Sequence, residues 1–150
     1  MGLSPTFRLN DTGEGVSRIR ANRQASSAVT KYRVLDSRAG CSLVELQPLT
    51  GVKHQIRVHL ASALGCPILG DHKHSCSSKL APQKLPENVL GKLGLDKSKT
   101  RHLPLHLHAR QMVLPGNNSH PEIRVVCPMP KYFAKVLHRL ELVFPDEDLK

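Results

Sequence analysis

The segment from Thr50 to Asp71 constrains the fold of this 150-residue chain more than any other. It reads TGVKHQIRVHLASALGCPILGD: a Thr-Gly turn, a basic and polar helix start, an apolar stripe and a Gly-Asp stop. Apolar residues recur at the helical spacing i, i+4, i+7, i+8, at Ile56, Leu60, Ala63 and Leu64. This spacing predicts a helix over 53–64, and Gly65 stands where a left-handed C-cap belongs.

Segments with strand-like alternation lie on both sides of this helix. Residues 29–35 (VTKYRVL) and 41–47 (CSLVELQ) alternate between the two faces of a strand, and the DSRAG link at 36–40 suits a hairpin. Residues 103–115 and 122–130 are two further predicted strands. A short helix is predicted around 87–93, and 131–144 has the period of an amphipathic helix.

Composition shifts divide the chain into three parts, the second of which contains an insertion. Residues 1–28 are polar and rich in Gly and Ser, which predicts a basic, polar arm in an extended or irregular strand conformation. Residues 29–144 carry the predicted elements. Within them, 73–102 are rich in Lys, Ser and Pro and resemble a surface insertion. Residues 145–150 form an acidic tail.

The charge of the chain favours a polyanionic partner. Twenty-two Lys and Arg against 12 Asp and Glu give a formal charge of +10. Each contact with a phosphate releases condensed counterions, so such an excess favours nucleic acid, although a solvated basic edge is the ordinary alternative. The basic residues ahead of the Thr50–Asp71 segment are Arg18, Arg20, Arg23, Lys31, Arg33 and Arg38.

The four cysteines and the hydropathy pattern indicate an intracellular protein with no membrane span. The cysteines form no CxxC pair and no framework spacing, so reduced thiols are expected. No stretch approaches the ~20 apolar residues of a membrane helix. The first residues also carry no signal or transit segment, which is compatible with synthesis without a leader or with a trimmed product.

The segment and its surroundings closely resemble the RluA-type pseudouridine synthases. TGVKHQIRVH and GCPILGD match that family's TG-x-x-HQ-[IL]-R-VH-[LM] and G-x-P-[IL]-x-GD signature. AVTKYRVL, SLVEL, LHLHARQMVLP and PMPKYFAKVLHRL resemble the family's flanking motifs, so the resemblance runs from about Ala28 to Leu140. GDHKHS and the long 73–102 insertion are similar to the vertebrate mitochondrial type.

The resemblance implies a fold, a reaction and a role for Arg57. The fold is α+β, a mixed and mainly antiparallel sheet with packed helices, here partial. The reaction isomerises uridine to pseudouridine in RNA (rRNA, with tRNA and mRNA as further candidates), without metal or organic cofactor. Arg57 matches the arginine that pairs with the catalytic aspartate, a task that suits its planar fork. A mitochondrial matrix location follows from the resemblance alone.

Three residues at the predicted helix start are candidates for RNA contact, together with the upstream basic residues. Lys53, His54 and Gln55 lie where free backbone N–H groups attract phosphate. His54 is equally suited to cap the helix, and His59 is expected to be structural. The family usually has Arg at the position of Val52, so one phosphate contact is expected to be missing. A zinc site from His72, His74, His106, His108 and Cys76 is disfavoured because these residues fall in structural motifs.

The family's nucleophile has no match in this chain. FRLNDTGEG at 7–15 is not its HRLDxxTSG turn, because an extra Asn separates Leu9 from Asp11 and Thr-Gly follows at once. Tyr32 belongs to a later strand than the family's base-stacking tyrosine. The chain is therefore predicted to be a C-terminal half, inactive alone, with an unpaired sheet edge that invites self-association. Arg57 should then face solvent or recruit a different carboxylate; the alternative function is a noncatalytic RNA-binding module.

Overall fold

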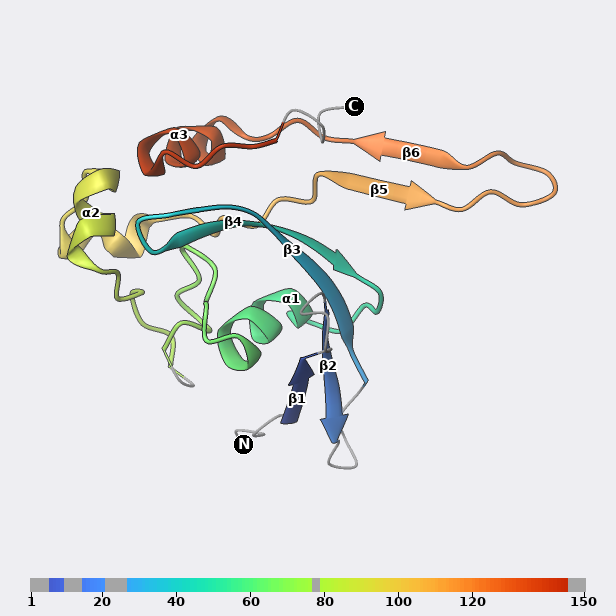
Figure 1. The fold of residues 1–150 in the computed structure, drawn as a ribbon, viewed down its shortest axis with the longest axis horizontal. Coiled ribbons are helices and arrows are strands. Elements are labelled where there is room, and N and C mark those ends of the chain that lie inside the picture. The colour runs from blue at the N-terminus through green and yellow to red at the C-terminus, as the bar shows by residue number, and fades with distance from the viewer. Residues whose placement is uncertain (1–5, 10–14, 21–26, 77–78, 146–150) are drawn as a thin grey trace.

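The computed structural model describes residues 6–9, 15–20, 27–76 and 79–145 (Figure 1). Among these residues every strand pairing is antiparallel, in one four-stranded sheet and one separate two-stranded hairpin. Helices pack beside the larger sheet, which confirms the α+β class. None of the helices in the described ranges is long and apolar enough to cross a membrane.

The larger sheet is a meander in the order β1-β2-β3-β4. Its strands are β1 (Thr6–Leu9), β2 (Gly15–Arg20), β3 (Val29–Arg38) and β4 (Cys41–Pro48). The predicted β3–β4 hairpin is confirmed, and its turn is tight because Ala39 and Gly40 both adopt positive φ (52° and 78°), the conformation that two-residue hairpin turns require. The described part of 1–28, expected as an extended arm or irregular strand, contains two strands of the sheet, whose pairing shifts register between Thr6 and Phe7.

The helix of the motif is confirmed over most of its length. It consists of α1 (Gln55–Val58) and a π-helical continuation, η1 (His59–Ala63). It begins two residues later than predicted because His54 has φ 57°, outside the helical region. Gly65 takes the expected left-handed conformation (φ 64°), and the Cys66 N–H donates back to the Leu60 carbonyl oxygen at 2.9 Å, which closes the helix.

The segment expected as a surface insertion contributes to the core instead. Its helix α2 (Glu87–Leu93) is followed by a 3₁₀ turn, η2 (Lys97–His102), and packs against α3 (Lys131–Leu140). Val89 and Leu93 are each 1% exposed. They form one apolar cluster with side chains from β4, from α3 and from the segment after α3, made of Leu43, Val89, Leu93, Leu137, Leu140 and Leu142. The Lys- and Pro-rich composition of 73–102 predicted a surface segment, although Val89, Leu90 and Leu93 form an apolar i, i+1, i+4 face on α2.

The C-terminal elements are shorter than predicted. Of the alternating stretch 103–115 only β5 (Gln111–Leu114) is a strand, and it pairs with β6 (Ile123–Val126). Figure 1 shows this hairpin extending away from the rest of the chain. Residues 103–110 run along the 66–70 segment without forming a ladder, with the His106 N–H donating to the Leu69 carbonyl oxygen at 2.9 Å. The helix α3 stops at Leu140 because Glu141 has φ 58°.

Candidate functional site

Arg57 lies in α1 and forms a two-bond pair with Asp71 in the Gly-Asp turn. The Arg57 Nε–H donates to Asp71 Oδ2 at 3.0 Å, and Nη2 donates to Oδ1 at 2.7 Å. The Asp71 side chain is 0% exposed and that of Arg57 is 20% exposed. Arg57 therefore recruits a carboxylate of this chain, one of the two alternatives expected from the sequence.

The environment of Asp71 keeps its carboxylate ionised. Burial alone would raise its pKa, but the hydrogen bonds from Arg57 and from the backbone N–H of His74 outweigh burial and hold the pKa at about 2. The N–H groups of Lys73 and His74 donate to Oδ1 at 3.2 and 3.0 Å. The hydrogen bonds that Arg57 donates to the Asp71 carboxylate raise the pKa of Arg57 in turn. Asp71 thus holds the guanidinium in one orientation by charge and by two-point geometry.

Gly70 places Asp71 by bringing two backbone segments together. Its φ is 81°, and a Cβ at this position would lie 2.6 Å from the Pro104 carbonyl carbon and closer still to its oxygen. The Gly70 N–H donates to Gln83 Oε1 at 2.7 Å, and Gln83 Nε2 donates to the Ile68 carbonyl oxygen at 3.1 Å. Only glycine fits both the backbone conformation and the space, so the Gly-Asp pair is required by packing.

A buried polar network joins the start of α1 to β3. Gln55 Nε2 donates to the Val29 carbonyl oxygen at 2.8 Å and to Thr30 Oγ1 at 2.9 Å. Its Oε1 accepts from Thr50 Oγ1 at 2.7 Å and from a backbone N–H. His59 Nδ1 lies 2.8 Å from Thr30 Oγ1, so the structural role expected for His59 is confirmed.

Gln55 was expected to contact RNA, and its burial contradicts this expectation. The residue is 7% exposed, and both amide hydrogens and both lone pairs of its oxygen are used inside the chain. It is therefore not on the surface that RNA can reach. Its place in the motif is explained by the network that holds α1 to β3.

His54 and His74 form a second pair beside Arg57. Their rings meet edge to face with centroids 5.2 Å apart, and His74 Nε2 lies 3.2 Å from His54 Nδ1. Burial, followed by the charge of Arg57, lowers the pKa of His54; burial also lowers that of His74, against the opposing charge of Asp71. The His54 side chain makes no cap hydrogen bond to α1, so the capping alternative is wrong.

The remaining basic candidates lie on different parts of the molecule. Thr30 of β3 bonds to α1 and η1, so by strand alternation Lys31 and Arg33 face the opposite side of the sheet. Both are exposed, and Arg33 pairs with Glu45 at 3.3 Å. Lys53 is exposed next to His54, on the α1 side. Arg18 and Arg20 belong to β2, while Arg23 and Asp11 lie outside the described residues.

The histidines considered for zinc are used in other ways. The Gln83 N–H donates to His72 Nδ1 at 3.0 Å, so Nε2 carries the proton and donates to the Leu103 carbonyl oxygen at 3.0 Å. His106 and His108 bond to the carbonyl oxygens of Pro104 and Cys127. In the described ranges no three His, Cys, Asp or Glu side chains gather as a metal site, and all four cysteines are free.

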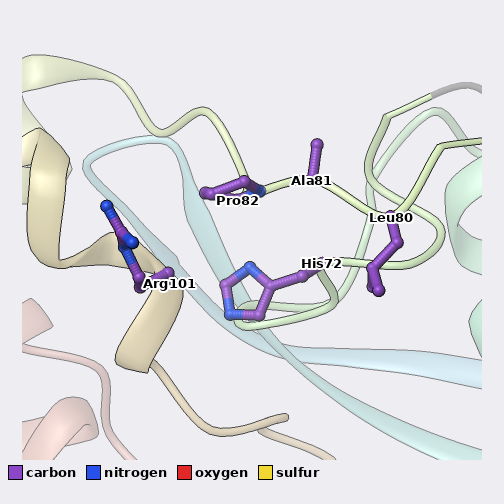
Figure 2. A pocket seen from close by; sticks show the side chains of 5 residues that line it. All are labelled: His72, Leu80, Ala81, Pro82 and Arg101. Atoms are coloured by element: carbon purple, nitrogen blue, oxygen red, sulfur yellow. The ribbon is translucent and has the colours of Figure 1, made fainter.

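Figure 2 shows a pocket beside this region, lined by His72, Leu80, Ala81, Pro82 and Arg101. Both ring nitrogens of His72 are already bonded to backbone, so Arg101 is the charged group that the lining leaves for a ligand. The pocket therefore lacks the several convergent polar groups that a small-molecule site requires. Its walls come from the end of the Gly-Asp turn and from the 79–102 segment, and the bond from the Gln83 N–H to His72 joins these two parts.

Two residues of the candidate site, Asp71 and His74, were missed in the sequence. Asp71 was assigned to a turn, although its place 14 residues after Arg57, at the end of the motif, was a signal that helix and turn meet. His74 had no signal as a partner of His54, because the contact depends on the turn made by Asp71 and the next two N–H groups.

Comparisons with known proteins agree on one family. The family model described as RNA pseudouridylate synthase matches residues 7–62. The mitochondrial pseudouridylate synthase RPUSD4 of zebrafish (Danio rerio) is 64% identical over 148 residues, 99% of this chain, and the human protein of that name is 54% identical over 149 residues. The solved structure of human RNA pseudouridylate synthase domain containing 4 matches 96% of this chain with a TM-score of 0.80 at 53% identity.

The chain spans about two fifths of the length of the relatives it matches, 41% of the zebrafish protein and 39% of the human one, and 53% of the solved chain. The match includes the Thr50–Asp71 motif, the Gly-Asp turn and the α3 helix, because it covers nearly the whole sequence. The fold and the likeness together place the chain: over nearly its whole length it is similar to RNA pseudouridine synthases of the RluA type, and it spans part of the length of these relatives.

Proposed function

We propose that this chain is part of an RNA pseudouridine synthase, which isomerises uridine to pseudouridine in RNA, and that Arg57 supports the catalytic aspartate supplied by the rest of the domain. The observation that carries the proposal is the fixed guanidinium of Arg57, held on one edge by Asp71. The chain alone, without that aspartate, is inactive.

The geometry of Arg57 leaves room for a second carboxylate. Asp71 occupies the edge formed by Nε and Nη2, and Nη1 forms no hydrogen bond within the described part of the chain. A guanidinium has five N–H donors, so its second edge can hold another carboxylate in a two-point contact. Arg57 then links a positioning aspartate of this chain to a reacting aspartate from outside it.

Asp71 itself is not suited to attack the substrate. Its side chain is 0% exposed, and its two oxygens already accept four hydrogen bonds. A nucleophile must reach the reacting carbon, and a carboxylate with a pKa of about 2 in a saturated site is a weak base. These facts support a positioning role for Asp71.

RNA contact falls to the exposed basic residues. The formal charge of +10 supplies the long-range attraction, and exposed Lys53 and half-buried His54, which lies near Arg57, stand where a nucleotide entering the site would pass. Lys31 and Arg33, on the other face of the sheet, are suited to a different stretch of RNA backbone. The sequence adds Arg18, Arg20 and Arg23 as further candidates for RNA contact. We expect rRNA as substrate, with tRNA and mRNA as alternatives.

The location follows from the relatives. Both curated relatives described above carry the word mitochondrial in their names. We therefore place the action of this chain in the mitochondrion, where the matrix holds the RNA that it would modify. Imaging of the tagged protein with a matrix marker tests this, and a purely cytosolic signal would contradict it.

The activity is tested in a chimaera in which this chain replaces the matching segment of the zebrafish relative. Release of tritium from [5-³H]uridine-labelled RNA is expected from the chimaera and absent from this chain alone. Arg57→Lys, which cannot make two two-point contacts, should lower kcat about 100-fold with little change in KM. Arg101→Lys, at the surface pocket, is the matched control and should leave both values unchanged.

An increase in KM with kcat unchanged would show that Arg57 only binds RNA. Full activity of the Arg57→Lys chimaera would refute the supporting role. RNA affinity is measured separately, by fluorescence anisotropy across a salt series. Lys53→Ala should reduce the slope of log Kd against log salt by about 0.7 for single-stranded RNA. Lys97→Ala, an exposed lysine paired with Glu87, should leave that slope unchanged.

A further inference from the structure

Two histidines beside Arg57 contact each other through ring nitrogens, and the support of an aspartate by Arg57 does not require this contact. His74 Nε2 lies 3.2 Å from His54 Nδ1, so one of these nitrogens carries a hydrogen and donates to the other. The rings meet edge to face with centroids 5.2 Å apart, and both residues are half-buried. We call His54 and His74 the histidine pair.

The backbone on both sides brings the histidine pair together. His54 lies directly before α1 with φ 57°, a left-handed conformation that residues with a side chain seldom adopt and that gathers at functional sites. His74 is placed by the Gly-Asp turn, where its backbone N–H donates to Asp71 Oδ1 at 3.0 Å. The carboxylate that fixes Arg57 therefore also fixes His74.

The charges that act on the histidine pair are mainly positive. Lys53 and Arg57 act from the α1 side and Lys73 from the Gly-Asp turn. Asp71 opposes them at one ring, but its two oxygens already accept four hydrogen bonds. Burial is the main reason that the pKa of each histidine lies below the usual 6.5, and the neighbouring cations lower it further. The pair is therefore uncharged at neutral pH.

An anion is the ligand that this arrangement suits. Lys53 and Lys73 are exposed, and each directly precedes one member of the histidine pair in the sequence. Their ammonium groups would repel a metal cation, and no third His, Cys, Asp or Glu joins the pair in the part of the chain that the structure describes. A phosphate group offers several oxygens that accept from ammonium and imidazolium donors.

We propose that the histidine pair and the two lysines beside it form a phosphate site for the RNA backbone, and that occupation of this site draws a proton from solvent onto the pair. The charged ring then donates to the other ring through one nitrogen and to the phosphate through its second nitrogen. A single added proton preserves the contact between the rings, because the second ring stays neutral and accepts. RNA as the source of the phosphate rests on the proposed function.

The direction of the pH dependence follows from this proton uptake. A neighbouring charge of opposite sign shifts the pKa of an ionisable group by about 1–3, and here a bound phosphate raises the pKa of the pair. Binding is therefore accompanied by proton uptake, and it tightens as the pH falls through the pKa of the occupied site. Affinity for RNA should rise about fivefold between about pH 7.5 and about pH 6.

The first test measures RNA affinity against pH with the chimaera of this chain and the zebrafish relative. A short labelled RNA without uridine is used at constant salt in fluorescence anisotropy, so that turnover plays no part. The wild type should bind about fivefold more tightly at the lower pH, and His74→Gln, which keeps a polar side chain but cannot take up a proton, should change less than about twofold. His138→Gln makes the same substitution at an exposed histidine of α3 and should behave as the wild type.

The second test needs no change in the pair. The ring signals of ¹³C-labelled histidines are followed by NMR through a pH titration, with and without the same RNA, and His54→Asn and His74→Gln assign the two signals. Addition of RNA should raise the pKa of the pair by about 1. A rise with inorganic phosphate but not with RNA would assign the site to free phosphate and overturn the proposal.

An unchanged titration of the pair in the presence of RNA would also overturn the proposal, as would an equal pH dependence of binding in His74→Gln and His138→Gln. Turnover of RNA by a chimaera whose RNA affinity does not depend on pH would count against this inference and leave the proposed function intact. Absence of turnover, with the pH-dependent binding and its loss in His74→Gln both observed, would count against the proposed function alone.

Discussion

Replacing Asp71 by asparagine removes one charge from a pair that is buried on the aspartate side. The pKa of Asp71 lies at about 2 against an ordinary value of 3.8. Each tenfold change in proton affinity corresponds to about 1.4 kcal/mol, so the ionised carboxylate stabilises the fold by about 2.5 kcal/mol at neutral pH. The 20% exposure of Arg57 lets water reach part of the stranded guanidinium, so we expect a loss of about 2–3 kcal/mol and not the 3–5 of a fully buried pair.

The effect of Asp71→Asn should depend on pH in a defined direction. Because the folded pKa is the lower one, the stabilisation is complete above the unfolded value near 4 and is lost as the pH falls toward about 2. The free energy of unfolding of wild type and Asp71→Asn, measured by urea titration, should therefore differ by about 2–3 kcal/mol at pH 7 and converge as the pH approaches 2.

Glu45→Gln is the matched control for this experiment. It removes the carboxylate of an ion pair with Arg33 at 3.3 Å, whose side chains are about half exposed. Such a pair contributes less than about 1 kcal/mol. If Asp71→Asn costs no more than Glu45→Gln at pH 7, or if its cost is the same at every pH, the buried pair does not hold the turn as argued.

Three further substitutions test packing, each against a control. Gly70→Ala should cost more than about 3 kcal/mol by thermal unfolding because its Cβ meets a backbone carbonyl, whereas Gly40→Ala, also at positive φ but in open space, should cost about 1. Leu93→Ala should cost about 2–5 kcal/mol, and Leu80→Ala, at 83% exposure, less than about 0.5. Gln55→Ala should cost about 2–3 kcal/mol, since it strands buried backbone and hydroxyl groups; a cost equal to that of Leu80→Ala would refute the network.

The local patterns of the sequence were sufficient for the β3–β4 hairpin, the motif helix and α2. Each of these depends on periodicity and on turn residues within about a dozen positions, such as Ala39-Gly40 and Gly65. The strand predicted over 103–115 was too long because its first half alternates but finds no ladder among the described residues. Alternation reports the exposure of side chains and does not report the presence of a partner strand.

The candidate site was only partly predictable for a similar reason. Arg57 was identified through the motif, but Asp71 as its partner depends on the approach of Gly70 to the Pro104 backbone, 34 residues along the chain. Burial of Gln55 likewise requires β3 beside α1. The prediction of a surface insertion at 73–102 followed from the charged and proline residues that dominate its composition. Its packing is instead decided by Val89, Leu90 and Leu93, which are buried.

The bonds from Gln83 to the Gly-Asp turn bear on how the gene can vary. Gln83 bonds to Gly70 and to His72, and His72 bonds to the Leu103 carbonyl oxygen. Gln83 lies inside the 79–102 segment and Leu103 directly after it, and this segment carries the fewest motif residues. An in-frame deletion or an alternative exon confined to 79–102 would leave every signature residue in place and still release Asp71 from its support. Substitutions in this stretch should therefore be weighed as changes to the site, even where an alignment of motifs shows no change.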